Sequence, residues 1–347
     1  ITTGLYNVAI GNEAGRVATT QDELVLIGYK AGYAINHDDA DGTVAIGYES
    51  GDAITEGAFN TAVGYQSLSA ITTQDSNTAL GYQAGKALTG LGCVFIGAKA
   101  GMNSTAGYNT VVGSEAFATE DGDGNSNVII GNSAAYSANN DSYDANVIIG
   151  NEAGTGGTGY LNECVVLGFR ALNSTAGTNH IGTIAIGSSA LTAVNHADAA
   201  GSVAIGHQSL AGLTSGQKNT AIGYEALYTQ VDGDQNTAVG YRALKMAEAA
   251  NDGWGNNTAV GALALTSLTT GVGNVAVGTQ CLDASTDGDG NIAIGYDALS
   301  NASVSEDFNI AIGYDTMKGV DEGTAGGDAD HNICLLYTSP SPRDGLL

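Results

Sequence analysis

Aspartates in three Asp-Gly-Asp loops are the residues of this chain best suited by type and spacing to bind a metal ion. They are Asp121, Asp123, Asp232, Asp234, Asp287 and Asp289. A calcium loop of the EF-hand type also needs glycine at its sixth position and glutamate at its twelfth. Counted from Asp232, those positions hold Thr237 and Ala243, so the pattern fails. We therefore expect acidic turns and no cofactor, with loop-bound calcium as the alternative.

Cysteine and histidine, the other common metal ligands, show no spacing typical of a metal site. Cys93 and Cys164 occupy the same column of the repeat described below, but they lie four copies apart, which is too far for a disulfide. Cys281 takes a small-residue position and is expected to be a buried thiol. The histidines are scattered, and no serine–histidine–aspartate order or recurring carboxylate pair is present. We expect no enzymatic activity.

Four tyrosines recur at nearly constant intervals: Tyr29, Tyr48, Tyr65 and Tyr82. Tyrosine rings offer large amphipathic contact areas, so an exposed row of them would suit a sugar or a protein receptor. The alternative is that the rings pack on one another or between chains. Both interpretations stay open at this point.

Each of these tyrosines follows a glycine that belongs to a repeat. The pattern is Asn-[Val/Thr/Ile]-Ala-[Ile/Val]-Gly, and its copies are about 18 residues apart. A period of this length is too short for helix-pair repeats and fits one coil of a β-solenoid. The anchor glycines of the 18 copies are Gly11, Gly28, Gly47, Gly64, Gly81, Gly97, Gly113, Gly131, Gly150, Gly168, Gly187, Gly206, Gly223, Gly240, Gly261, Gly278, Gly295 and Gly313.

The three positions before the anchor glycine are never charged. The outer two are β-branched or aliphatic, and the middle one is Ala in 12 copies and a larger apolar residue in the others. Because strand side chains alternate, such a strand is buried on both faces. We predict that the two β-branched columns face the core. The alanine column then faces outward, where the same column of another chain covers it around a symmetry axis.

The other columns fit a stacked coil. Asparagine, four residues before the glycine in 12 copies, could form amide ladders. The second residue after the glycine alternates in charge between some neighbouring copies, which predicts ion pairs such as Lys99–Glu115, Glu152–Arg170 and Glu225–Arg242. The fourth residue after it is glycine in six early copies and leucine or methionine from Leu172 on. We therefore expect a fuller core in the C-terminal half.

Composition narrows the function classes. Charged residues make up 13% of the chain and hydrophobic ones 43%, the reverse of a disordered protein. The formal net charge of −26 disfavours binding to nucleic acid. No apolar run is long enough to insert into a membrane.

The repeat resembles two families. The strings Ser-Val-Ala-Ile-Gly at 202–206 and Asn-Val-Ala-Ile-Gly at 7–11 are similar to the head repeats of YadA-like trimeric autotransporter adhesins. The Asn-Thr-Ala-Val-Gly-Tyr strings at 60–65 and 236–241 resemble repeats of phage tail-fibre proteins. The resemblance implies a left-handed parallel β-roll, with three chains around one axis, on a cell or virion surface. The period here is longer than in the shortest such heads.

The sequence thus predicts an all-β protein: a trimeric parallel β-solenoid (β-roll) of about 18 coils, forming one array over residues 1–333. Residues 334–347 leave the repeat pattern, contain both prolines and resemble translated sequencing-adapter read-through, so we assign them to a non-native tail.

The expected function is that of a non-catalytic structural and adhesive fibre module, located outside the cell or on a virion. Its partners would be further copies of itself and a surface receptor, either glycan or protein. Two alternatives remain. One is a monomeric solenoid whose Thr-containing face binds ice or another crystal, although the Thr column is expected to point inward. The other is a self-assembling extracellular filament.

Overall fold

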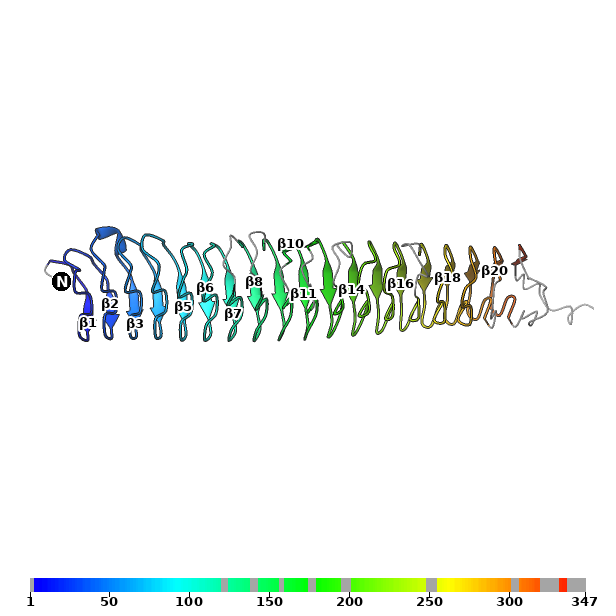
Figure 1. The fold of residues 1–347 in the computed structure, drawn as a ribbon, viewed down its shortest axis with the longest axis horizontal. Helices are drawn as coiled ribbons and strands as arrows, with labels where there is room; N and C mark the ends of the chain where they lie inside the picture. Colours follow the sequence, from blue (N-terminus) through cyan, green and yellow to red (C-terminus); the bar gives the residue numbers. More distant parts are fainter. Residues whose placement is uncertain are drawn as a thin grey trace, which may run out of the picture. The chain divides into compact units, whose positions relative to one another are not determined.

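A computed structural model describes residues 3–119, 124–137, 143–155, 159–173, 179–194, 201–247, 255–300, 306–318 and 331–335. The chain forms two compact units, Ile1–Ser188 with Asn195–Ala200, and Ser189–Val194 with Gly201–Leu347. Each unit is built from short parallel strands of three residues, stacked one coil after another (Figure 1).

In the first unit, successive strands pair in parallel without any shift in register. Val8, Ala9 and Ile10 lie opposite Val25, Leu26 and Ile27, and the same alignment holds for the following strands. The strands are β1 Val8–Ile10, β2 Val25–Ile27, β3 Val44–Ile46, β4 Thr61–Val63, β5 Thr78–Leu80, β6 Val94–Ile96, β7 Thr110–Val112, β8 Val128–Ile130, β9 Val147–Ile149, β11 Val165–Leu167 and β13 Ile184–Ile186.

Two further elements of the first unit lie in the segments that connect its three-residue strands. Strands β10 (Leu161–Asn162) and β12 (His180–Ile181) pair in parallel with each other as a separate small sheet. A short 3₁₀-helix, η1 (Asp38–Ala40), lies between β2 and β3, and His37 Nδ1 accepts a hydrogen bond from the Asp39 amide at its start.

The second unit repeats the same arrangement. Its strands are β14 Val203–Ile205, β15 Thr220–Ile222, β16 Thr237–Val239, β17 Thr258–Val260, β18 Val275–Val277, β19 Ile292–Ile294, β20 Ile310–Ile312 and β21 Ile333–Leu335. Strand β21 contains Cys334 and Leu335, two residues that the sequence analysis assigned to the tail. Residues 336–347 lie outside the described part of the chain.

The anchor glycines let neighbouring coils stack closely where each strand ends. Gly47 has φ +139°, and a Cβ added to it would lie 2.3 Å from the carbonyl oxygen of Gly64 in the next coil. An L-residue rarely adopts this conformation and would also collide with the backbone, so the position requires glycine.

The predicted asparagine ladder is present and fixes the coil before each strand. Asn60 Nδ2 donates to the Gln74 carbonyl at 2.8 Å, and Asn60 Oδ1 accepts the amide of Asn77 in the next coil at 3.0 Å. The same pair of bonds recurs in the second unit, where Asn274 Oδ1 accepts the Asn291 amide at 2.9 Å. Buried amides are thus satisfied by side chains of the neighbouring coil.

The interior of each coil contains the middle residue of the strand. From β2 to β20 this residue is fully buried in every strand of the main sheets, whether it is Ala45, Phe95 or Ile148. The first and third residues are only partly buried or are exposed. The prediction that the β-branched columns face the core and alanine faces outward is therefore wrong: the two faces are interchanged.

The physical reason is the thinness of the coil. The strand packs directly against the corner residue four positions after the anchor, so that a Cβ added to Gly101 would meet the Phe95 ring at 2.7 Å. In the second unit, where the corner is leucine, as at Leu227, the strand carries alanine (Ala221). At two of the early glycine corners, Gly32 and Gly101, Leu26 and Phe95 fill the corresponding space from the strand.

The all-β class and the parallel solenoid expected from the repeat are thus confirmed. The handedness of the coil and the trimer stay predictions.

Candidate functional site

The outward residues of the strands form a continuous apolar surface in each unit. We call the first and third residues of each three-residue strand the strand surface. In the second unit, the third residues are evenly exposed, since Ile222, Val260 and Val277 each keep 37% of their surface accessible. Parallel strands in register bring these side chains into two straight rows. Large contiguous apolar patches of this kind mark interaction sites on protein surfaces.

Threonines interrupt the valines and isoleucines of the strand surface in short runs. Thr220, Thr237 and Thr258 lie opposite one another on three successive strands, and Thr61 pairs with Thr78 in the first unit. All are partly exposed. The Thr column was expected to point inward, and the structure corrects this, because it belongs to the outward face.

The four tyrosines of the first unit form a stacked ladder, which we call the tyrosine ladder. The ring centroids of Tyr29 and Tyr48, of Tyr48 and Tyr65, and of Tyr65 and Tyr82 lie 5.1, 5.0 and 5.5 Å apart. The four residues also keep 38–49% of their surface exposed. The two interpretations of the sequence are therefore compatible, since the rings pack on one another and still present their edges to solvent.

A row of polar side chains runs beside the tyrosine ladder, one residue further along each coil. Gln83 Nε2 donates to Gln66 Oε1 at 3.1 Å, and Gln66 Nε2 donates to Glu49 Oε2 at 2.9 Å. At the start of the row, the Lys30 ammonium lies 5.3 Å from the centroid of the Tyr29 ring. We call Lys30, Glu49, Gln66 and Gln83 the polar row. These residues belong to the column two positions after the anchor glycine, from which ion pairs were predicted, and here amide hydrogen bonds link the coils.

A shorter aromatic stack lies in the second unit. His207 stacks on Tyr224 with centroids 5.1 Å apart, and Tyr224 stacks on Tyr241 at 5.6 Å. The Arg242 guanidinium lies 5.0 Å from the Tyr241 ring centroid. A cation thus covers the last ring of this stack.

Three of the predicted ion pairs between coils are present. Lys99 contacts Glu115 at 3.3 Å, Arg170 contacts Glu152 at 2.6 Å, and Arg242 contacts Glu225 at 2.9 Å. Lys245 also contacts Glu225, and the hydrogen bond from Lys245 is the main cause that lowers the pKa of the Glu225 carboxyl. Lys30, in contrast, lies over tyrosine rings, and Glu13 pairs with Arg16 within its own coil.

The candidate calcium loops have a structural explanation where they are described. Asp234 Oδ1 accepts a hydrogen bond from the Gln217 amide at 2.7 Å, and Asp289 Oδ1 accepts one from the Val272 amide at 2.8 Å. Both carboxylates thus link neighbouring coils. Asp232 and Asp287 precede them in the same turns, and Asp121 and Asp123 lie outside the described residues. Within the described part of the chain, no group of three or more His, Cys, Asp or Glu residues could hold a metal ion.

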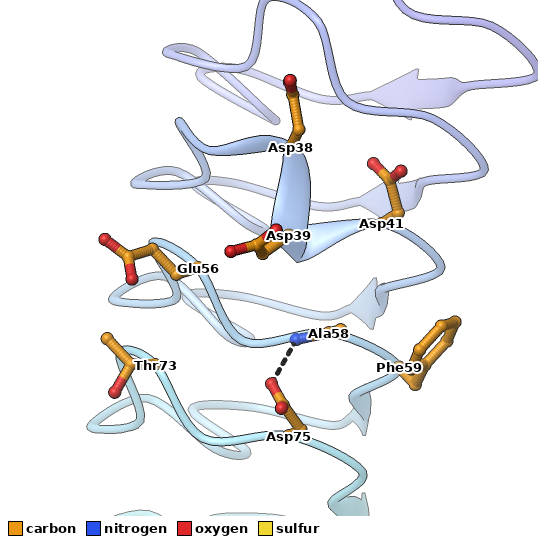
Figure 2. A pocket seen from close by; sticks show the side chains of 8 residues that line it. All are labelled: Asp38, Asp39, Asp41, Glu56, Ala58, Phe59, Thr73 and Asp75. Carbon is orange, nitrogen blue, oxygen red and sulfur yellow. Dashed lines mark hydrogen bonds between the residues drawn. The ribbon is translucent and has the colours of Figure 1, made fainter.

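A hollow of about 430 Å³ in the first unit gathers carboxylates on the turn side (Figure 2). Asp38, Asp39 and Asp41 come from η1 and the residue that follows it, and Glu56 and Asp75 come from later coils. Two of these carboxylates bond to the backbone, because Asp41 accepts the Asp22 amide at 2.7 Å and Asp75 accepts the Ala58 amide at 2.8 Å. The hollow therefore contributes negative charge to the coils that also carry the tyrosine ladder.

The cysteines are free thiols, and Cys93, Cys164 and Cys281 are buried. Burial raises the pKa of Cys164 to about 11 and that of Cys281 to about 12. Such thiols are unreactive at neutral pH. Burial also lowers the pKa of His180, in β12, to about 4.

A comparison with protein-family models gives no match for this chain, and a comparison with curated proteins gives none either. Among the described residues, no helix has the length and hydrophobicity needed to cross a bilayer.

Proposed function

We propose that this chain is a non-catalytic structural and adhesive module of an extracellular fibre, in which three copies associate through their strand surfaces. The observation that carries the proposal is the strand surface itself. In both units, each described coil presents two outward apolar or threonine side chains in register, with no charged residue among them.

The exposed rows are suited to contact between identical chains. Burial of apolar area contributes roughly 25 cal/mol per Å², and a row repeated on every coil adds up to a large interface. A closed symmetric assembly buries the same row on every copy and leaves no apolar face open. The negative charge of the chain lies outside the strands, on turns and loops, where it keeps such an assembly soluble.

Sedimentation equilibrium of the full chain at micromolar concentration tests the proposal. We expect a species of three times the 34.7 kDa chain mass. A stable monomer would overturn the proposal. Long filaments in electron micrographs would instead support the self-assembling filament.

A second candidate function is favoured by the outward threonines. A flat, regular row such as Thr220, Thr237 and Thr258 could order water at the surface of ice or another crystal. Thermal hysteresis of the purified chain measures this activity. Hysteresis in a monomer, lost on Thr237→Lys, would replace the fibre proposal, and its absence from the wild type would exclude ice binding.

A further inference from the structure

We propose that the tyrosine ladder and the polar row together bind a neutral, extended polysaccharide that runs across the coils. This inference rests on the adhesive role proposed above and names the class of ligand. It follows from the stacking of the rings, from the hydrogen bonds beside them and from the charge of the surrounding coils.

The ladder offers edges and hydroxyl groups rather than ring faces. Tyr48 and Tyr65 stack at 5.0 Å with planes only 7° apart, so their faces cover each other, while 43% of each residue stays exposed. The exposed part of a stacked tyrosine is its apolar edge and its phenol hydroxyl. A ligand on the ladder therefore meets alternating apolar edges and hydroxyl groups at intervals of one coil.

The polar row adds a second line of donors and acceptors at the same interval. A primary amide has two N–H donors and an oxygen with two lone pairs. In Gln66, the bonds within the row use one N–H and accept one bond on the oxygen. The remaining capacity, together with the Glu49 carboxylate, suits the hydroxyl groups of a sugar.

The interval fits a polymer of sugars. Coils of a parallel solenoid repeat about every 4.8 Å, and the successive rings of an extended polysaccharide have nearly the same spacing. Four coils in register would thus present the same groups at intervals close to the length of one sugar unit.

The negative charge of the protein favours an uncharged polysaccharide as the ligand. The polar row holds one cation, Lys30, and one carboxylate, Glu49, while Asp38, Asp39, Asp41 and Glu56 lie around the hollow of Figure 2. The chain as a whole has a formal net charge of −26. An anionic polymer would be repelled by these carboxylates at moderate ionic strength.

The stack in the second unit provides an internal control. Beside Tyr224 and Tyr241, the Glu225 carboxylate contacts both Arg242 and Lys245 at 2.9 Å, and Arg242 also covers the Tyr241 ring. Its polar groups are occupied by ion pairs, so we expect no sugar binding there.

The test is isothermal titration of the full chain with hexamers of β-1,4-linked glucose and N-acetylglucosamine, with oligogalacturonate as the anionic probe. We expect binding to a neutral hexamer that weakens at least tenfold in Tyr48→Ala/Tyr65→Ala. The matched variant Tyr224→Ala/Tyr241→Ala should bind like the wild type. Thermal unfolding shows that each variant is folded, and Gln66→Leu, which leaves the rings in place, should also weaken binding.

No binding of either neutral hexamer to the wild type, stronger binding of oligogalacturonate, or equal loss in both double variants would overturn the inference. A trimeric mass with no sugar binding would reject the ligand but leave the fibre proposal intact. A monomer that still binds the hexamers would do the reverse.

Discussion

In the first unit, the coil around Gly97 has Phe95 in the middle of its strand and Gly101 at its corner, whereas the coil around Gly223 in the second unit has Ala221 and Leu227. The corner residues have the same left-handed backbone, with φ +54° at Gly101 and +51° at Leu227. In both coils one large side chain fills the thin interior. It comes from the strand in the first coil (Phe95) and from the corner in the second (Leu227). The leucine corner carries a left-handed conformation that is costly for an L-residue, by roughly 1–2 kcal/mol. Full burial of the leucine offsets this cost.

The size of the middle strand residue and the size of the corner residue depend on each other in these coils. Leu26 faces Gly32, and Ile148 faces Gly154, while the leucine corners of the second unit face alanine. The anchor glycines do not take part in this exchange, because the backbone of the next coil excludes any side chain from their position in both units.

Substitution of an anchor glycine should have the largest effect, and the same one in both units. Gly47→Ala and Gly223→Ala place a Cβ 2.3 and 2.2 Å from the next carbonyl oxygen. We expect each to lower the free energy of unfolding by about 4 kcal/mol or more, at the upper end for single substitutions. Urea unfolding followed by circular dichroism measures the change.

Gly273→Ala is the matched control for the anchor glycines. Gly273 has φ +70° but nothing within 4 Å of an added Cβ, so only backbone strain of roughly 1 kcal/mol is expected. Equal losses at Gly223 and Gly273 would show that close stacking of the coils is not what requires the glycine.

Exchanging strand and corner should convert a coil of the first unit into one of the second-unit type. Phe95→Ala leaves a cavity and should cost about 3–5 kcal/mol. Gly101→Leu alone overpacks the coil against the Phe95 ring, at a cost of about 1–3 kcal/mol. The double variant should recover most of the loss, because leucine fills the cavity. Thermal or urea unfolding of all four proteins gives the coupling energy, and simple additivity would contradict the pairing.

A buried histidine should give the first unit a pH dependence of its own. His180 has its pKa lowered to about 4 by burial, from an ordinary value of 6.5. As pH falls, the unfolded chain takes up this proton first, so stability present above pH 6.5 is lost progressively down to about pH 4. The free energy of unfolding falls by about 3 kcal/mol over this range.

His180→Gln should flatten that part of the stability curve. The difference in urea midpoint between wild type and variant, measured from pH 7 to pH 4, isolates the histidine from the carboxylates. Parallel curves would show that His180 does not titrate in this range.

The ion pairs between coils should have the smallest effects. Arg242→Gln removes a contact to Glu225 that is partly open to solvent, and Lys99→Gln removes the more exposed pair with Glu115. Each is expected to cost less than about 1 kcal/mol, with the cost reduced further by salt. A loss of several kcal/mol at either position would mean that the pairs fix the register of the coils.

Much of this architecture could be predicted from the repeat. When the copies of the repeat are aligned, equivalent positions predict the three-residue strands, the anchor glycines, the asparagine ladder and three of the ion pairs. The face of the strand that points into the coil could not be predicted from the alternation of side chains, because both faces are apolar. Size alone misleads here, since the larger side chains point outward.

The sequence nevertheless contains a pattern that indicates which strand residue points into the coil. Phe95 and Ile148 occur where the corner is Gly101 and Gly154, and alanine occurs at the leucine corners from Leu191 on. Such exchange of size indicates that the two columns touch. The acidic hollow was less predictable, because it depends on which turn residues of different coils come together.

The oligomeric state of two variants from the same coil tests whether the strand surface is the contact between chains. Ile222 lies on the strand surface, and Tyr224 lies two residues further along, in the aromatic stack. We expect Ile222→Lys to sediment as a folded 34.7 kDa monomer, while Tyr224→Lys keeps the trimeric mass of the wild type. An unchanged trimer in Ile222→Lys, or a monomer in the wild type, would contradict the account.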